Sequence, residues 1–282
     1  MMEFFELNNG VSIPKLGLGT FLMDPAQAQA ATTAALKNGY QLIDTANAYL
    51  NERGVGRGIK AAGVARDQLF LSSKLWPTIY TNPHAVDETL ARLGVDMVDL
   101  MFLHQPAGDF MAGYRQLEAA YRAGKIRAIG ISNFYGTKLT RLLNEAEIKP
   151  QVLQTEAHPY FTQDEVRAQL KEVKTRLMAW YPLGHGDKSL INEPIFAELA
   201  AKYHKTSVQI ILRWHIQMGF IVIPGSTNPD HIKSNAAIFD FQLMANEMAA
   251  IEKINKHQRY YEPNDAKEEG YASMELDFNA QE

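Results

Sequence analysis

Three short apolar runs in the first 104 residues each end on a single ionisable side chain. These side chains are Asp44, Lys74 and His104, and Tyr49 follows Asp44 by one loop. In parallel barrels and sheets, the carboxyl ends of the strands meet at one face, and functional groups gather there. We therefore expect Asp44, Tyr49, Lys74 and His104 to converge on one mouth of the fold.

Together these four groups are suited to donating a proton to a substrate oxygen, better than to nucleophilic attack or metal binding. A tyrosine hydroxyl has a pKa of about 10, which is high for a proton relay at neutral pH. The ammonium of Lys74 is expected to lower the pKa of Tyr49 by favouring the phenolate, while Asp44 keeps Lys74 charged. A neutral His104 can orient and polarise a carbonyl oxygen. None of these groups is a reductant, so the chemistry needs a separate hydride source.

The elements that would position these groups alternate between strands and helices. Eight strands are predicted, at residues 16–20, 40–44, 69–74, 98–104, 127–132, 152–155, 177–180 and 220–223. Helices are predicted at residues 26–38, 83–93, 111–123, 163–174, 193–204 and 207–218. This alternation without a linker predicts one domain over residues 1–282, with an α/β fold of the (β/α)₈ TIM barrel type. A doubly wound sheet is the alternative, because periodicity alone does not prove that a sheet closes.

The two ends of the chain carry separate predictions. Residues 3–7 and 11–14 are predicted to form a β-hairpin, with Asn8-Asn9-Gly10 supplying its turn. The tail from about residue 258 is rich in acidic residues after Pro263 and has weak periodicity. We therefore expect this tail to be loop.

Composition excludes several classes of function. The chain has 282 residues, 46% hydrophobic and 21% charged, which is typical of a globular protein. Its net charge of −4 offers no bulk attraction to nucleic acid or to an anionic membrane. The absence of cysteine excludes disulfides, thiolate catalysis and cysteine-bound zinc. No apolar stretch approaches the roughly 20 residues of a membrane span, and no secretory signal is evident. We expect a cytoplasmic, monomeric, metal-free enzyme acting on a small molecule.

Seven segments, in order along nearly the whole chain, resemble signatures of the aldo-keto reductases, and of their bacterial branch that includes the 2,5-diketo-D-gluconate reductases. They are residues 39–46 (GYQLIDTA), 73–76 (SKLW), 103–104 (LH), 129–134 (IGISNF), 154–159 (QTEAHP), 181–184 (YPLG) and 223–226 (IPGS). The resemblance implies a (β/α)₈ barrel with a hairpin closing its bottom. It also implies reversible, NAD(P)H-dependent reduction of aldehydes and ketones. Asp44, Tyr49, Lys74 and His104 would be the catalytic residues, with Tyr49 the proton donor.

The same resemblance implies which residues bind the cofactor. Ser132, Asn133 and Gln154 match the groups that hold the nicotinamide carboxamide, and their donors and acceptors suit an amide. Trp180 stands where an aromatic ring stacks on the nicotinamide. Further positions that match the cofactor side are Gly19, Thr20, Leu183, Gly225, Ser226, His231 and Asn235.

Four residues depart from the family pattern. One of them, Ser234, stands where the family has a glutamate before the adenine-contacting residue, which is Asn235 here. Gly225 and His231 stand where the family commonly has a lysine and an arginine that bind the 2′-phosphate of NADPH. Glycine has no charge and imidazole is a weaker phosphate ligand than guanidinium, so we expect NADP(H) with plausible use of NAD(H). Gln105 replaces a common tryptophan on the substrate side, where Phe21 and Trp76 supply an aromatic lining. The short loop after Gln105 predicts an open pocket of broad specificity, which fits aldehydes, diketones, keto-sugars or keto-acids.

Two other functions fit the same alternation of strands and helices. A regulatory barrel could bind the cofactor and sense its redox state with little turnover, although the complete set of four catalytic residues argues against it. An isomerase or aldolase barrel could use Lys74 to form a Schiff base.

The glycine-rich stretch at residues 54–58 lies in a predicted helix and is given no phosphate-binding role.

Overall fold

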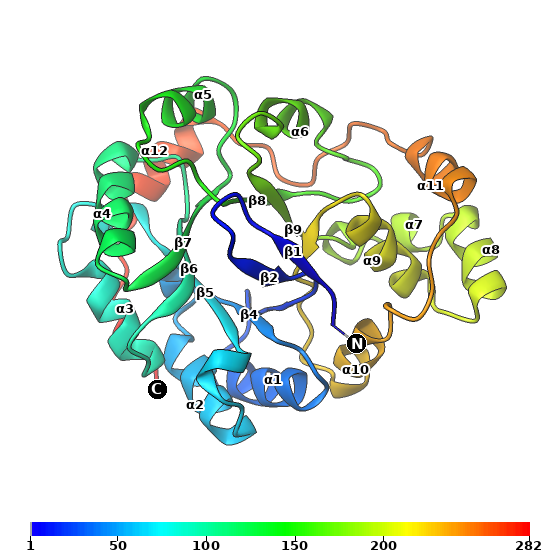
Figure 1. Cartoon of the computed structure of the whole chain (residues 1–282), viewed down its shortest axis with the longest axis horizontal. Helices are drawn as coiled ribbons and strands as arrows, with labels where there is room; N and C mark the ends of the chain where they lie inside the picture. Colours follow the sequence, from blue (N-terminus) through cyan, green and yellow to red (C-terminus); the bar gives the residue numbers. More distant parts are fainter. Residues whose placement is uncertain (1) are drawn as a thin grey trace.

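Eight parallel strands form one curved sheet at the centre of the protein (Figure 1). The computed structural model describes residues 2–282. The strands follow one another across the sheet in chain order: β3(Leu18–Gly19), β4(Leu42–Asp44), β5(Phe70–Leu75), β6(Val98–Leu103), β7(Ile126–Ser132), β8(Val152–Glu156), β9(Arg176–Trp180) and β10(Ile221–Val222). Each lies within two residues of its predicted bounds. A doubly wound sheet reverses its strand order at the centre, so this sequential order excludes that alternative.

Backbone contacts also connect the two edges of the sheet. Leu16 forms a parallel bridge with Val222. The amide of Gly17 donates to the carbonyl of Val222 at 2.8 Å, and the amide of Val222 donates to the carbonyl of Lys15 at 3.0 Å. The segment that leads into β3 is therefore hydrogen-bonded to β10.

The predicted N-terminal hairpin is confirmed. It consists of β1(Phe4–Glu6) and β2(Ser12–Pro14), paired antiparallel, and it lies across the centre of the curved sheet in Figure 1. Gly10 in its turn has φ +82°, a conformation that glycine adopts without strain. Leu7 and Ile13 are buried in the same hydrophobic cluster as inward-facing side chains of the sheet, so the hairpin seals this end of the core.

Helices surround the sheet (Figure 1). They are α1(Pro25–Lys37), α2(Glu52–Ala62), α3(Ala85–Leu93), α4(Phe110–Arg122), α5(Gly136–Glu145), α6(Asp164–Leu170), α7(Lys188–Ile191), α8(Pro194–Tyr203), α9(Ser207–Gln217), α10(Pro229–Ala236), α11(Ala245–Glu252) and α12(Asp265–Ser273), with short 3₁₀ turns η1(Asn47–Tyr49), η2(Arg66–Gln68), η3(Pro77–Ile79) and η4(Gly184–Gly186). None of those in residues 2–282 is long and apolar enough to cross a membrane.

Glycines at residues 54–58 allow α1 and α2 to pack closely. A Cβ at Gly54 would lie 2.2 Å from the carbonyl oxygen of Pro25, and one at Gly58 would lie 2.7 Å from that of Gln29. Both distances are far shorter than a carbon side chain tolerates. These contacts give the two glycines a packing role.

The prediction that the C-terminal tail is loop was wrong for α12. The side chain of Asn264 caps this helix by accepting from the amide of Lys267 at 2.9 Å. The indole Nε1 of Trp76 donates to the carbonyl of Met274 at 3.1 Å, which fastens the end of the helix to the segment after β5. No residue of α12 is fully buried. The helix therefore lacks the strong apolar periodicity that would identify it in the sequence.

Candidate active site

The predicted catalytic residues do meet, and a buried ion pair lies at their centre. The ammonium of Lys74, on β5, is 2.6 Å from Oδ2 of Asp44, at the end of β4, and the two side chains are 0% and 2% exposed. The Lys74 ammonium also donates to the carbonyl of Thr45 at 2.8 Å. Lys74 is therefore held by a charge and a carbonyl that come from one neighbouring strand end.

The second carboxylate oxygen of Asp44 is also bound. The hydroxyl of Ser72 donates to Oδ1 of Asp44 at 2.7 Å, and Nε2 of Gln154 donates to the same oxygen at 3.1 Å. Gln154 thus contacts the ion pair, a role that its sequence position did not suggest. These bonds fix the carboxylate and, through it, the lysine.

Tyr49 lies over this pair at the end of η1. The ammonium of Lys74 is 5.0 Å from the centroid of the Tyr49 ring, and the rings of Tyr49 and His104 meet edge to face at 5.5 Å. Tyr49 is half-buried, whereas His104 is 8% exposed. Nδ1 of His104 is buried and has no hydrogen-bond partner among the described residues.

Burial is the largest influence on the pKa values of Lys74, Tyr49 and His104. It lowers the pKa of Lys74, although the Asp44 carboxylate opposes this shift. Burial also raises the pKa of Tyr49 well above its usual value, and the charge of Asp44 adds to the rise. The pKa of Tyr49 is therefore raised overall, and not lowered as we expected from the neighbouring Lys74. Burial, followed by the charge of Lys74, holds the pKa of His104 well below its usual range. At neutral pH the phenol is protonated and the imidazole is neutral.

The groups expected to bind nicotinamide lie at adjacent strand ends. Ser132 ends β7 and is in register with Gln154 of β8. Asn133 follows with φ +64°, a left-handed conformation in which asparagine is enriched. Its amide nitrogen donates to Oε1 of Gln105 at 3.2 Å, and its oxygen accepts from Nε1 of Trp180 at 2.9 Å. Trp180 thereby fixes Asn133, a contact that the sequence did not indicate.

The other predicted cofactor residues gather around β3, η4 and α10. Gly225 and His231 are exposed, Ser226 and Leu183 are half-buried, and Asn235 is buried. A Cβ at Gly19 would lie 2.8 Å from the carbonyl oxygen of Ile223, and one at Gly225 would lie 3.1 Å from that of Gly19. The hydroxyl of Thr20 donates to the backbone carbonyl of Asp44 at 3.1 Å, which links this region to the ion pair.

Aromatic side chains surround Tyr49 and His104. The Phe21 ring is 48% exposed and lies 5.0 Å from the Tyr49 ring, and the Trp76 ring lies 5.2 Å from that of His104. Tyr271 of α12 meets Trp76 at 5.3 Å. Tyr271 could not be predicted as a neighbour of this site, because it lies almost 200 residues from Trp76 and no local pattern connects them.

Behind the ion pair lies a second buried charge pair that the sequence analysis also missed. Nε of Arg92 is 2.6 Å from Oε2 of Glu52, and both side chains are nearly excluded from solvent. The hydroxyl of Ser73 donates to Oε1 of Glu52 at 2.6 Å. Burial raises the pKa of Glu52, and the charges of Arg92 and Lys74 oppose the rise. Because Ser73 precedes Lys74 on β5, this pair anchors the strand that carries the lysine.

Within residues 2–282, no group of three or more histidine, aspartate or glutamate side chains could hold a metal ion.

Comparisons with known proteins identify relatives that match nearly the whole chain. A model of the Aldo/keto reductase family matches residues 15–256. Glyoxal reductase of Bacillus subtilis is 44% identical over 264 residues, covering 92% of this chain and 95% of that protein. Methylglyoxal reductase DkgA of Yersinia pestis is 39% identical over 263 residues, covering 92% and 95% respectively. A Bombyx mori aldo-keto reductase solved in complex with NADP has a TM-score of 0.88 and 33% identity, covering 95% of this chain and 98% of that one.

Fold and site together define an oxidoreductase that acts on carbonyl or alcohol groups with a nicotinamide cofactor. The chain belongs to the aldo/keto reductase family. The family and the enzyme class predicted from the sequence are thereby confirmed, and no observation favours the regulatory alternative.

Proposed function

We propose that this enzyme reduces small aldehydes and ketones to alcohols, with Tyr49 as proton donor. One observation carries the proposal: the Asp44–Lys74 ion pair is buried beneath the ring of Tyr49, with a neutral His104 at its edge. A protonated phenol next to a fixed ammonium is suited to give up a proton when negative charge develops on a nearby oxygen.

Each residue has a defined part in the reaction. The nicotinamide cofactor supplies a hydride to the carbonyl carbon when it is bound. Tyr49 transfers its hydroxyl proton to the carbonyl oxygen, and Lys74 stabilises the phenolate that remains. His104 donates a hydrogen bond to the same oxygen from its neutral ring. Asp44 holds Lys74 in place, as its contacts to Ser72 and Gln154 support.

The residues present fit a nicotinamide cofactor. Ser132 ends β7 in register with Gln154 of β8, so a hydroxyl and a carboxamide, groups that can pair with an amide, lie side by side at the strand ends. We propose that Ser132, Asn133 and Gln154 hold the carboxamide and that Trp180 packs on the ring. The remainder of the cofactor would be held by Gly19, Thr20, Leu183, Gly225, Ser226, His231 and Asn235. We propose NADPH as cofactor, with NADH also used because Gly225 and His231 lack fixed charge.

Small dicarbonyl compounds are the substrates that we propose. The relatives named above are a glyoxal reductase and a methylglyoxal reductase. Phe21 and Trp76 supply apolar walls, and Gln105, whose backbone is fixed by hydrogen bonds to the hydroxyl of Tyr80 at 2.7 and 3.0 Å, supplies a polar one. Pockets for small organic ligands combine such a lining with a few placed polar groups.

Tyr49→Phe tests the proposed proton donor. We expect kcat for methylglyoxal reduction to fall roughly 10²–10⁴-fold, the usual contribution of a general acid, with the Kd for NADPH nearly unchanged. Tyr121→Phe is the matched control, because Tyr121 lies on α4 and its hydroxyl contacts the hairpin residue Asn9 at 3.4 Å. Turnover by Tyr49→Phe within threefold of wild type would remove Tyr49 from this role.

We also propose that the sheet closes into a complete (β/α)₈ barrel and that residues 1–282 form a single domain. The Leu16–Val222 bridge supports closure. The cytoplasmic location and the monomeric state stay predictions from the sequence.

A further inference from the structure

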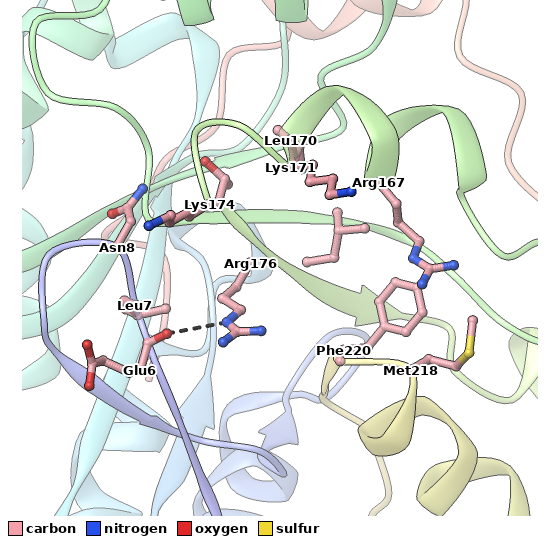
Figure 2. A pocket seen from close by; sticks show the side chains of 13 residues that line it. Glu6, Leu7, Asn8, Arg167, Leu170, Lys171, Lys174, Arg176, Met218 and Phe220 are labelled. Carbon is pink, nitrogen blue, oxygen red and sulfur yellow. Dashed lines mark hydrogen bonds between the residues drawn. The ribbon is translucent and has the colours of Figure 1, made fainter. Parts of the chain in front are cut away.

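A basic hollow lies between the hairpin, the end of α6 and the start of β9 (Figure 2). Its volume is about 630 Å³. Four cationic side chains line it: Arg167, Lys171, Lys174 and Arg176. Glu6 is the one acidic residue among the lining residues that the structure describes. This concentration of positive charge contrasts with the net charge of −4 of the whole chain.

The hollow is at the opposite end of the sheet from the active site. Arg176 begins β9, whereas Trp180, near the catalytic groups, ends the same strand. Phe220 lines the hollow immediately before β10. Side chains at the two ends of a strand cannot contact one ligand across the packed core, so the hollow is separate from the carbonyl-reducing site.

Most of these cations have no carboxylate partner. Lys171 and Lys174 are exposed, and neither forms an ion pair within residues 2–282. Arg176 donates from Nε to the backbone carbonyl of Glu6 at 3.3 Å and lies over the ring of Phe5. Arg167 pairs with Asp164 at 3.4 Å, but that carboxylate is half exposed and such surface pairs are weak. Lys171 and Lys174 can therefore turn to an anionic ligand, and the two arginines add positive charge beside them.

The turn that carries the lysines is fixed in place. The predicted helix at residues 163–174 in fact ends at Leu170, and Lys174 has φ +55°, a left-handed conformation that is uncommon outside glycine. The hydroxyl of Thr175 donates to the carbonyl of Pro150 at 2.7 Å. The side-chain amide of Asn8 donates to the carbonyl of Val173 at 3.0 Å. The hairpin therefore holds this turn against the hollow, and the site is formed before a ligand arrives.

We propose that this hollow binds a small molecule that carries a chain of three or more phosphate groups. Several cations around one cavity match the spread charge of a polyphosphate better than that of a single carboxylate. The volume lies within the range of small-molecule pockets. Phe220 is only 1% exposed and offers no surface on which a base could stack. Recognition therefore rests on the phosphate chain, which inorganic triphosphate and nucleoside triphosphates share.

Calorimetric titration with sodium triphosphate, and separately with ATP, tests the proposal. The titrations are run on the full chain with and without saturating NADPH, which occupies any phosphate site at the catalytic mouth. We expect one site per chain with Kd below 1 mM in both conditions, weakening as salt is raised. Lys171→Ala/Lys174→Ala should weaken binding at least tenfold. The matched control is Lys37→Ala/Lys60→Ala, which removes two exposed lysines from α1 and α2.

The outcomes separate clearly. Equal binding of triphosphate and ATP, lost only in Lys171→Ala/Lys174→Ala, supports recognition of the phosphate chain. Tighter binding of ATP with the same dependence on the two lysines also supports it and adds a contact to the nucleoside. Absence of heat at millimolar ligand, binding that NADPH abolishes, or equal losses in both double variants would each overturn the proposal. A single-stranded oligonucleotide that binds through these lysines while triphosphate does not would replace it with a nucleic-acid surface. Because Tyr49→Phe tests the reductase activity separately, failure of one proposal leaves the other intact.

Discussion

Replacing His231 with arginine should shift the cofactor preference toward NADPH. His231 is exposed in the first turn of α10, and Gly225 is exposed just after β10. On the proposed binding mode both face the 2′-phosphate that distinguishes NADPH from NADH. A guanidinium is always charged and can donate two parallel hydrogen bonds to phosphate, which imidazole cannot do.

The expected gain is about 1 kcal/mol, because the site is exposed and exposed ion pairs contribute about 0–1 kcal/mol. Asp230 precedes His231 in the same first turn and would compete with the phosphate for the guanidinium. The ratio of Kd for NADH to Kd for NADPH should therefore rise roughly fivefold. Adding Gly225→Lys should raise this ratio by less. A Cβ at residue 225 would lie 3.1 Å from the carbonyl oxygen of Gly19, so that oxygen must shift slightly to make room for the new side chain.

Quenching of tryptophan fluorescence on titration with each cofactor at pH 8 measures the two dissociation constants. His84→Arg is the matched control, because His84 is also exposed but precedes α3. A ratio that changes equally in both variants would show a general effect of charge and refute the local argument. A wild-type ratio that already favours NADPH a thousandfold would show that other residues, such as Ser226, hold the phosphate.

Two further predictions concern buried charge. Lys74→Met should be nearly inactive, and its free energy of unfolding in urea should be roughly 3–5 kcal/mol lower, because Asp44 stays buried without a counterion. Asp44→Asn should reduce turnover less than Lys74→Met does. If both variants fold and Asp44→Asn is the more harmful, Asp44 has a direct chemical role. Burial lowers the pKa of His215 from 6.5 to about 4. The unfolded chain therefore binds a proton at this residue more tightly than the folded protein does. The contribution of neutral His215 to stability is complete above pH 6.5 and is lost as pH falls toward 4. Unfolding free energies at pH 7.5 and pH 5 should differ by about 2 kcal/mol more in wild type than in His215→Gln, and parallel pH profiles would contradict this reasoning.

The sequence predicted the parts of the fold that depend on local pattern. Each strand is a short apolar run bounded by polar loops, so the sheet and the ends that carry Asp44, Lys74 and His104 could be found without a structure. The hairpin followed from Asn9 and Gly10, whose conformational preferences are local. These features need no knowledge of what packs against them.

Contacts between distant segments could not be predicted in the same way. The hydrogen bond from Trp76 to Met274 that fastens α12 spans 198 residues. The helix has no fully buried residue, so no apolar pattern in the sequence predicts it. From the sequence alone, Glu52 and Arg92 are expected to be exposed, because charged residues are almost never fully buried unless they are paired. Only the fold brings the two together.

The pKa of Tyr49 was misjudged for a related reason, and the reason bears on the mechanism. A neighbouring ammonium lowers the pKa of a phenol, but withdrawal from water raises it, and only the structure shows that burial is the larger effect. Burying Lys74 with Asp44 also costs desolvation, which the hydrogen bonds from Ser72 and Gln154 and to Thr45 offset. The result is a phenol that keeps its proton at neutral pH beside an ammonium that cannot move away. On the proposed mechanism, Lys74 then acts on the phenolate as it forms rather than on the resting phenol. Stabilisation of the phenolate that appears only during proton transfer accelerates the reaction. An equal lowering of the pKa of Tyr49 in the resting enzyme would instead deprotonate the donor before the substrate arrived.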